Sequence, residues 1–182
     1  MSPSTIVPTL TTARLTLRPF SPEDAPALHR LAATPGVMQY FPTPEPPDLA
    51  RVERIIARQL GEWEERGYAW WAVTLPVDDT LLGWCGLQYL PDTNETEVGY
   101  LLGREWWGNG YATEAARASV DFGFEHFDFA EIIGITHPNN TASQNVLKKC
   151  GMHFTAATRY FNMDCFRFVV TRAAWMSARV MK

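Results

Sequence analysis

The chain contains little cysteine, with only Cys85, Cys150 and Cys165 in a sequence of 182 residues. These three residues lie far apart, form no Cys-x-x-Cys pair and are odd in number, so neither a disulfide framework nor a zinc site is expected. The four histidines are scattered and lack the spacing of metal ligands. We therefore expect reduced thiols and no metal.

The sequence also lacks a cluster of lysines and arginines, and its formal net charge is −4. Proteins that bind nucleic acids usually present a basic face, so this class of partner is not expected. No apolar run is long enough to span a bilayer, and the first residues do not have the charged start and apolar centre of a secretion signal. These absences predict a cytoplasmic protein with neither nucleic-acid nor membrane partners.

The composition that is present, 46% hydrophobic and 20% charged residues, is typical of a globular protein. At this length one domain with a substantial core is expected rather than two. The sequence contains neither an internal repeat nor a linker. We predict a single domain over residues 10–176, flanked by short tails at 1–9 and 177–182.

Local patterns predict a mixed α/β domain with the element order β-α-α-β-β-β-α-β-α-β-β. Strands are indicated by apolar alternation or short apolar runs. Helices are indicated by helical periodicity with capping residues, such as Ser21 at a start and Gly67 at an end. The expected strands cover 14–20, 68–75, 81–90, 95–102, 131–136, 154–161 and 166–172, and the expected helices cover 21–33, 49–67, 111–127 and 140–151.

The segment Gly108-Asn109-Gly110 stands between a predicted strand and a predicted helix. The first N–H groups of a helix have no partner within it and carry the positive end of its dipole, and glycines let an anion approach them. A P-loop would place a lysine and a hydroxyl after the second glycine, but Tyr111 and Ala112 follow here, and the third glycine of a dinucleotide fingerprint is absent. The segment therefore indicates a loop that holds a phosphate without reacting at it. The alternative is an ordinary tight turn.

A second segment, Asn140-x-x-Ser143, stands where another helix begins. Asn140 is expected to cap that helix through its side chain. Capping alone does not explain why this segment and the glycine loop occur in one chain.

Together, EVGYLLGREWWGNGYATEAARASVDFGF and ITHPNNTASQNVLKKCGM resemble the GNAT (Gcn5-related N-acetyltransferase) superfamily, in the branch typified by the RimJ/RimL ribosomal-protein N-acetyltransferases. The opening LTTARLTLRPFSPEDAPALHRLAA resembles the same branch. The resemblance implies a single-domain fold with a central, mixed, mostly antiparallel twisted sheet of about seven strands, flanked by four helices and splayed between the fourth and fifth strands. It also implies direct transfer of an acetyl group from acetyl-CoA to a primary amine.

The resemblance places the family's acetyl-CoA signature, Gln/Arg-x-x-Gly-x-Gly/Ala, on the six residues from Trp107 to Ala112. Trp107 replaces the usual Gln or Arg, for which the sequence offers no reason, and Asn109 stands where the branch often has a basic residue. The residues expected to bind the cofactor are Tyr100, Leu101, Leu102, Trp107, Gly108, Asn109, Gly110, Tyr111, Ala112, Thr113, Asn140 and Ser143.

Acetyl transfer requires a neutral amine, a donor to the thioester oxygen and a thiolate that can leave. Glu97 is the candidate base, directly or through water, since burial raises the pKa of a strand carboxylate. The alternative is that Glu97 is a solvated residue at a strand edge. The backbone N–H groups around Tyr100 to Leu102 are the candidate donors to the oxygen. Ser143 is the candidate that protonates or hydrogen-bonds the departing sulfur.

The acceptor groove is expected beside the loop at 36–47, with Tyr40, Phe41, Trp70 and Trp71 as candidate lining residues. Trp70 and Trp71 are neighbours on a strand, so their side chains point to opposite faces. The acceptor stays open between a small-molecule amine and the N-terminal amine of a peptide or protein, and assembly into a homodimer stays open as well. Two further functions remain as alternatives: a CoA-binding sensor without catalysis, and an acyltransferase with another acyl donor or acceptor.

Overall fold

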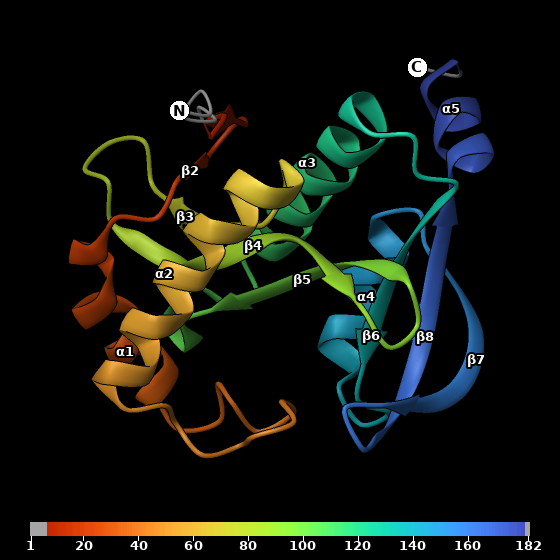
Figure 1. Cartoon of the computed structure of the whole chain (residues 1–182). Helices are drawn as coiled ribbons and strands as arrows, with labels where there is room; N and C mark the ends of the chain where they lie inside the picture. Colours follow the sequence, from red (N-terminus) through yellow and green to blue (C-terminus); the bar gives the residue numbers. More distant parts are fainter. Residues whose placement is uncertain (1–6, 181–182) are drawn as a thin grey trace.

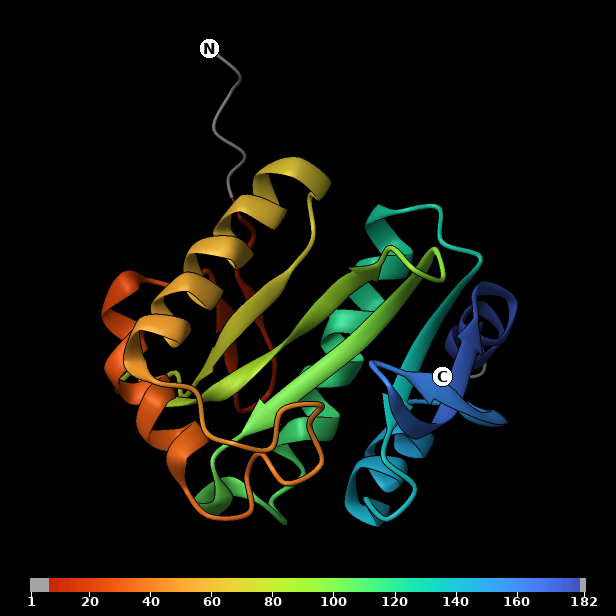
Figure 2. The same cartoon turned by 60° about the horizontal axis from the view of Figure 1, so that its bottom comes forward.

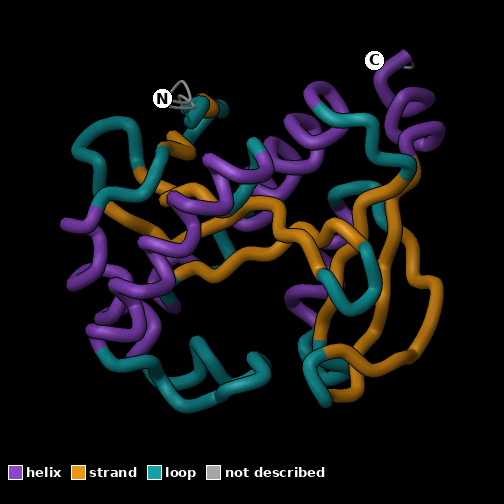
Figure 3. Tube along the Cα trace, viewed as in Figure 1, coloured by secondary structure: helices purple, strands orange, loops and turns teal. Residues whose placement is uncertain are grey.

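An eight-stranded sheet runs through residues 7–180, the part of the chain that the computed structural model describes (Figure 1). Its strands are β1 (Leu10–Thr11), β2 (Thr16–Arg18), β3 (Trp70–Thr74), β4 (Leu81–Leu90), β5 (Glu95–Leu102), β6 (Glu131–Thr136), β7 (His153–Tyr160) and β8 (Met163–Thr171). The α-helices are α1 (Ala25–Ala33), α2 (Leu49–Arg66), α3 (Tyr111–His126), α4 (Thr141–Lys149) and α5 (Arg172–Val180), with 3₁₀ turns η1 (Pro22–Asp24) and η2 (Arg104–Trp106). Figure 3 shows how these helices, strands and loops follow one another along the chain.

The strands are ordered β1-β2-β3-β4-β5-β6-β8-β7 across the sheet. Every neighbouring pair is antiparallel except β5 and β6, which run parallel. These two strands are in register at a single pair, Glu97 with Ile133, and then diverge (Figure 2). The predicted splay is therefore confirmed, and it lies between the strands predicted as fourth and fifth. The observed numbers, five and six, are higher because β1 adds a two-residue strand at the edge.

Two apolar clusters cover the two faces of the part of the sheet formed by β1 to β5. On one face α1 and α2 pack over Trp70, Ala72, Trp84 and Leu101. On the other face α3 packs over Trp71 and Cys85, and it approaches closely because its inner residues are small. Gly123 shows how close this approach is, since a Cβ there would lie 2.7 Å from Cδ1 of Leu87.

The helix boundaries follow the capping residues in the sequence. Ser21 begins the turn that leads into α1, with its N–H donated to the Asp24 carboxylate at 2.8 Å. Asp48 caps α2, which ends at Gly67 with φ of 74°. Asn140 caps α4, as predicted, by accepting a hydrogen bond from the Ser143 N–H at 3.1 Å.

Helix α5 is the main difference from the predicted order, which ended on two strands. None of its residues is fully buried, although Trp175 packs partly buried against the core. Contacts from its side chains attach it: Arg172 donates to the carbonyl oxygens of Phe124 and Phe129, and the Trp175 indole donates to Asp121. The domain boundary predicted at 176 falls inside this helix, and the predicted tail residues 1–6 and 181–182 lie outside the described part.

Within residues 7–180 no helix is both long enough and apolar enough to cross a membrane.

Candidate active site

The gap between β5 and β6 is the central feature of the site. On one side of the Glu97–Ile133 pair, Arg167 of β8 closes the gap by binding Glu95 of β5 at 2.7 Å and Glu131 of β6 at 2.6 Å. On the other side β5 continues to Leu102 and pairs only with β4 along its opposite edge. The other edge of β5, around Tyr100 to Leu102, is thus not paired with a strand, because β6 has already diverged from it.

The glycine loop lies just past the open end of β5. Gly108 and Gly110 have φ values of 78° and 81°, which explains why both positions are glycine. Asn109 closes the loop by donating from its side-chain amide to the carbonyl oxygens of Trp106 and Trp107. Trp107 in turn donates its indole N–H to the carbonyl oxygen of Leu102 at 2.8 Å. The structure therefore gives Trp107 a role: it ties the loop to the end of the splayed strand.

The first turn of α3 has unused hydrogen-bond donors. Gly110 is its N-cap residue, and no side chain of the described part of the chain caps it. Of the other helices, α2 is capped by Asp48 and α4 by Asn140, whereas α1, like α3, has no side-chain cap. An uncapped helix start behind an exposed glycine loop fits an anion such as a pyrophosphate. Tyr111, Ala112 and Thr113 follow Gly110 in this first turn, partly or largely buried against the core.

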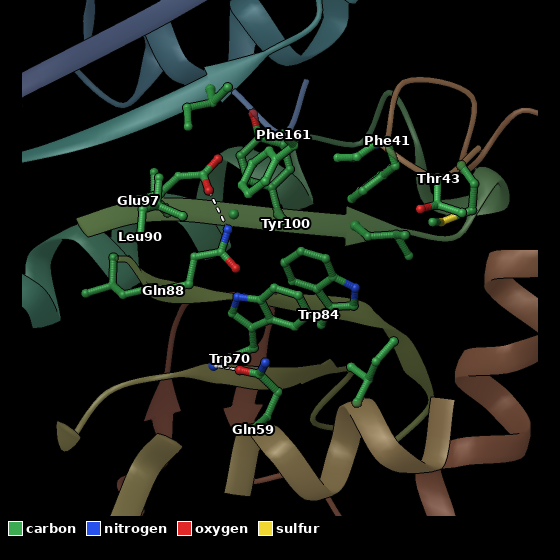
Figure 4. Close-up of a pocket in the computed structure, with 18 of the residues that line it drawn as sticks. Phe41, Thr43, Gln59, Trp70, Trp84, Gln88, Leu90, Glu97, Tyr100 and Phe161 are labelled. Carbon is green, nitrogen blue, oxygen red and sulfur yellow. Dashed lines mark hydrogen bonds between the residues drawn. The ribbon is translucent and has the colours of Figure 1, made fainter. Parts of the chain in front are cut away.

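Glu97 lies at the point where the two strands part, and only 6% of its surface is exposed. Its carboxylate accepts a hydrogen bond from the side-chain amide of Gln88 on β4 (Figure 4). Burial raises the pKa of Glu97 to about 7, even though the hydrogen bonds from Gln88 and the Ile135 backbone lower it. The reading of Glu97 as a solvated strand-edge residue is therefore wrong. It is a buried carboxylate whose pKa burial raises toward neutral pH.

Tyr100 of β5 and Ser143 of α4 are in hydrogen-bond contact. The Tyr100 hydroxyl lies 2.8 Å from Oγ of Ser143 and also donates to the Ser143 carbonyl oxygen at 3.2 Å. Burial raises the pKa of Tyr100 well above its usual value, so its hydroxyl stays protonated. The Ser143 hydroxyl thus has a neutral hydrogen-bond partner behind it, and both side chains line the same cavity as Glu97.

A cavity of about 670 Å³ extends from Glu97 along one face of the sheet to the loop between α1 and α2. Tyr40, Phe41 and Trp70, which the sequence suggested as residues of an acceptor groove, are among the residues that line it. Trp70 stacks on Trp84 with ring centroids 3.7 Å apart, and Phe41 meets the edge of Trp84 (Figure 4). The cavity therefore joins one buried carboxylate to an aromatic wall.

Trp71 does not line this cavity. It is fully buried on the opposite face of the sheet, where it packs edge-on against Trp63 and Phe122 and donates its indole N–H to the Pro8 carbonyl oxygen. The alternation of strand side chains had indicated that only one of the two neighbouring tryptophans faces each side, and the structure identifies Trp70 as the one at the cavity.

Three residues of the site were not singled out from the sequence. Gln88 contacts Glu97, Trp84 forms the floor of the cavity, and Phe161 lines its far wall from the turn between β7 and β8. Phe161 has a φ of 51°, an uncommon conformation for a bulky residue. Alternation along β4 places Trp84 and Gln88 on the sheet face that carries Trp70. The predicted pairing of β3 with β4 could therefore have identified both as residues of the site.

The cysteines have no catalytic setting. Burial raises the pKa of Cys85 and of Cys150 to about 12, so neither forms a thiolate near neutral pH. Among the described residues, no group of three or more His, Cys, Asp and Glu side chains is arranged to hold a metal ion.

Comparison with known proteins gives a consistent set of relatives. The Acetyltransferase (GNAT) domain family matches residues 14–153. The FsC-acetyl coenzyme A-N(2)-transacetylase of Aspergillus fumigatus is 30% identical, over 93% of this chain and 78% of that protein. The crystal structure of an acetyltransferase from Agrobacterium tumefaciens str. C58 has a TM-score of 0.79 and 30% identity, covering 90% of this chain and 94% of that one. A RimL ribosomal L7/L12 α-N-protein acetyltransferase in complex with coenzyme A has the same fold, with a TM-score of 0.75, 18% identity, and coverage of 91% and 97%.

Proposed function

The chain belongs to the GNAT acetyltransferase family, and from this premise we propose that it transfers an acetyl group directly from acetyl-CoA to a primary amine. The observation that carries the proposal is the position of Glu97. This buried carboxylate lies where β5 and β6 part and lines the aromatic cavity, on the strand whose far end continues through the glycine loop to the uncapped start of α3.

The donor site fits acetyl-CoA in two respects. The N–H groups at the start of α3 suit the two phosphates, and Gly108 and Gly110 leave room for them. The open edge of β5 suits the pantetheine arm, whose amide groups are able to pair with an extended backbone. The names of the relatives support this donor, since one is named an acetyl coenzyme A-N(2)-transacetylase and another has a solved structure in complex with coenzyme A.

Each catalytic task has a candidate in the chain. Glu97 takes the proton from the acceptor's ammonium group, directly or through a water, because its raised pKa matches a base that works near pH 7. The backbone N–H groups around Tyr100 to Leu102 donate to the carbonyl oxygen as it gains charge. Ser143 donates to the departing sulfur, with the Tyr100 hydroxyl behind it. Acetyl-CoA supplies the activated acetyl group and the thiolate that leaves.

The cavity supports an acceptor amine carried on an apolar or aromatic body. Trp70, Trp84, Phe41 and Phe161 offer aromatic surface, and the amine end of such a molecule would reach Glu97. Aromatic faces also attract cations, which favours an ammonium group entering the cavity. A protein N-terminus that begins with small polar residues would leave most of this wall unused.

The test is thiol release from acetyl-CoA with a matched set of acceptors: 2-phenylethylamine, spermidine, and a short peptide with a free N-terminus. We expect the highest kcat/KM with 2-phenylethylamine. Preference for the peptide would assign the site to protein N-termini instead. Thermal stabilisation by coenzyme A without turnover of any amine would favour a CoA-binding sensor, and the absence of stabilisation as well as turnover would contradict both functions.

A further inference from the structure

The donor loop brings no positive charge of its own. From Gly108 to Thr113 the residues are uncharged, and the first charged side chain of α3 is an acid, Glu114. A carboxylate in the first turn of a helix is favourable toward the helix dipole, but it repels a phosphate bound at the same place. A site for the pyrophosphate of acetyl-CoA therefore needs this charge to be neutralised.

Arg14 lies against Glu114 although the two residues are 100 positions apart in the sequence. Its Nε and Nη2 atoms each lie 2.7 Å from Oε2 of Glu114, and its backbone N–H donates to Oε1 at 2.8 Å. The Thr12 hydroxyl also donates to Oε1, at 2.7 Å. Although burial acts to raise the pKa of Glu114, these hydrogen bonds lower it overall, so the carboxylate stays ionised and its lone pairs are directed at Arg14 and Thr12.

The same guanidinium group also contacts the glycine loop. Its Nη1 donates to the carbonyl oxygen of Asn109 at 2.9 Å, and its Cζ lies 4.8 Å from the centre of the Tyr111 ring. The peptide between Asn109 and Gly110 is trans, because no cis peptide occurs in residues 7–180. In a trans peptide the C=O and the following N–H point in opposite directions. By holding the Asn109 carbonyl, Arg14 therefore turns the Gly110 N–H away from itself.

We propose that Arg14 is a positioning residue for the acetyl donor: it neutralises Glu114 and fixes the peptide that directs the Gly110 N–H at the donor's phosphates. This inference rests on the proposed function, because it takes acetyl-CoA as the donor. It names a residue outside the glycine loop, supplied by the segment before β2, as part of the donor site.

The experiment compares Arg14→Gln with Arg179→Gln in the full chain. Arg179 is a matched control: its side chain is 48% exposed against 49% for Arg14, it also pairs with a glutamate, Glu125, and it also lies over an aromatic ring, that of Trp175. We expect Arg14→Gln to raise the KM for acetyl-CoA and the Kd for coenzyme A roughly tenfold, with kcat at saturating donor nearly unchanged, since a hydrogen-bonded charge is lost from the donor site. Arg179→Gln should leave all three constants unchanged.

Two more variants separate the charge from the fold. Arg14→Lys keeps the charge and should restore part of the affinity for coenzyme A. Glu114→Gln placed in the Arg14→Gln background removes the uncompensated acid and should also restore affinity, even if the double variant melts no higher. The inference is overturned if Arg14→Gln binds coenzyme A as tightly as the wild type, or if its Kd rises no more than that of Arg179→Gln. The proposed function fails separately, if the wild-type protein itself neither binds coenzyme A, measured by calorimetry, nor releases thiol.

Discussion

Glu97 is a carboxylate that the fold keeps from water, and this sets its chemistry. At its raised pKa of about 7, most Glu97 side chains are protonated at pH 6 and most are ionised at pH 8. A base has to be ionised to accept a proton, so kcat/KM should rise with pH through this range and then level off. An exposed glutamate with an ordinary pKa would give no such rise above pH 6.

Glu97→Gln should therefore lower kcat/KM by roughly a hundredfold or more, the usual contribution of a general base. It should also remove the part of the pH–rate profile centred near pH 7. The measurement is the pH dependence of kcat/KM for both proteins, with Glu64→Gln on the exposed face of α2 as the control. If the rise near pH 7 persists in Glu97→Gln, the base lies elsewhere.

Ser143 offers a second single-residue prediction. Ser143→Ala removes the hydroxyl that the Tyr100 hydroxyl contacts, but it keeps the backbone N–H that Asn140 uses to cap α4, so the helix should stay intact. We expect kcat to fall roughly tenfold or more, because the departing sulfur loses its proton donor. Steady-state kinetics with acetyl-CoA varied decide the matter: an unchanged kcat with a raised KM would make Ser143 a binding residue only.

Helix α3 depends on the backbone conformation of the residue before it. Gly110→Ala places a Cβ at a φ of 81° and 3.4 Å from Nη2 of Arg14, so we expect it to lower the free energy of unfolding by about 1–2 kcal/mol. Gly61→Ala in α2 is the matched opposite case, since nothing lies within 4 Å of its Cβ and the position is helical. It should raise the free energy of unfolding by about 0.5–1 kcal/mol. Denaturant unfolding of both variants measures the two signs, and equal signs would contradict the account.

Elements with local signals could be predicted from the sequence, and elements held by distant contacts could not. Gly67 and Asn140 mark the end of α2 and the start of α4, and both boundaries agree with the structure. Strand β1 has two residues, too few to show alternation, and α5 has no buried face. Its attachment depends on hydrogen bonds from Arg172 to carbonyl oxygens more than 40 residues away, which no local pattern reveals.

The same division applies to the candidate site. The glycine loop and the Asn140–Ser143 segment are each continuous in sequence, so their resemblance to the family's donor-binding motifs could be seen without the structure. Arg14, near the N-terminus, contacts the glycine loop through the Asn109 carbonyl oxygen, and Phe161 reaches the cavity from the turn between β7 and β8. Their positions depend on the order of strands in the sheet, which the residue types alone do not specify.

At the scale of the whole molecule, the sheet consists of two parts that meet along a short seam. Strands β1 to β5 form one part and β6 to β8 the other, joined at the Glu97–Ile133 pair and by the ion pairs of Arg167 with Glu95 and Glu131. Figure 1 shows the strands of the two parts running in clearly different directions. The opening between them is where we propose that the pantetheine arm binds.

This arrangement predicts a specific pattern of amide hydrogen exchange. The N–H groups of Tyr100 to Leu102 that face β6 should exchange fast without donor, and saturating coenzyme A should slow them because it supplies the missing acceptors. The N–H groups of β5 that face β4 are the internal control, since that edge is paired in full register. Equal protection of both edges before and after coenzyme A is added would contradict the prediction.

Binding of the proposed donor in the opening of the sheet would also make the rate at which the protein is degraded depend on the donor concentration. A ligand that binds only the folded state adds to its free energy of unfolding, by about 2.7 kcal/mol at a hundred times the Kd. For a protein of ordinary marginal stability that gain lowers the unfolded fraction about a hundredfold, and proteases act on that fraction. Where the proposed donor is scarce, the folded state loses this added free energy, and the chain would be degraded sooner. The gap between β5 and β6 would thus make the lifetime of the enzyme follow the concentration of acetyl-CoA around it.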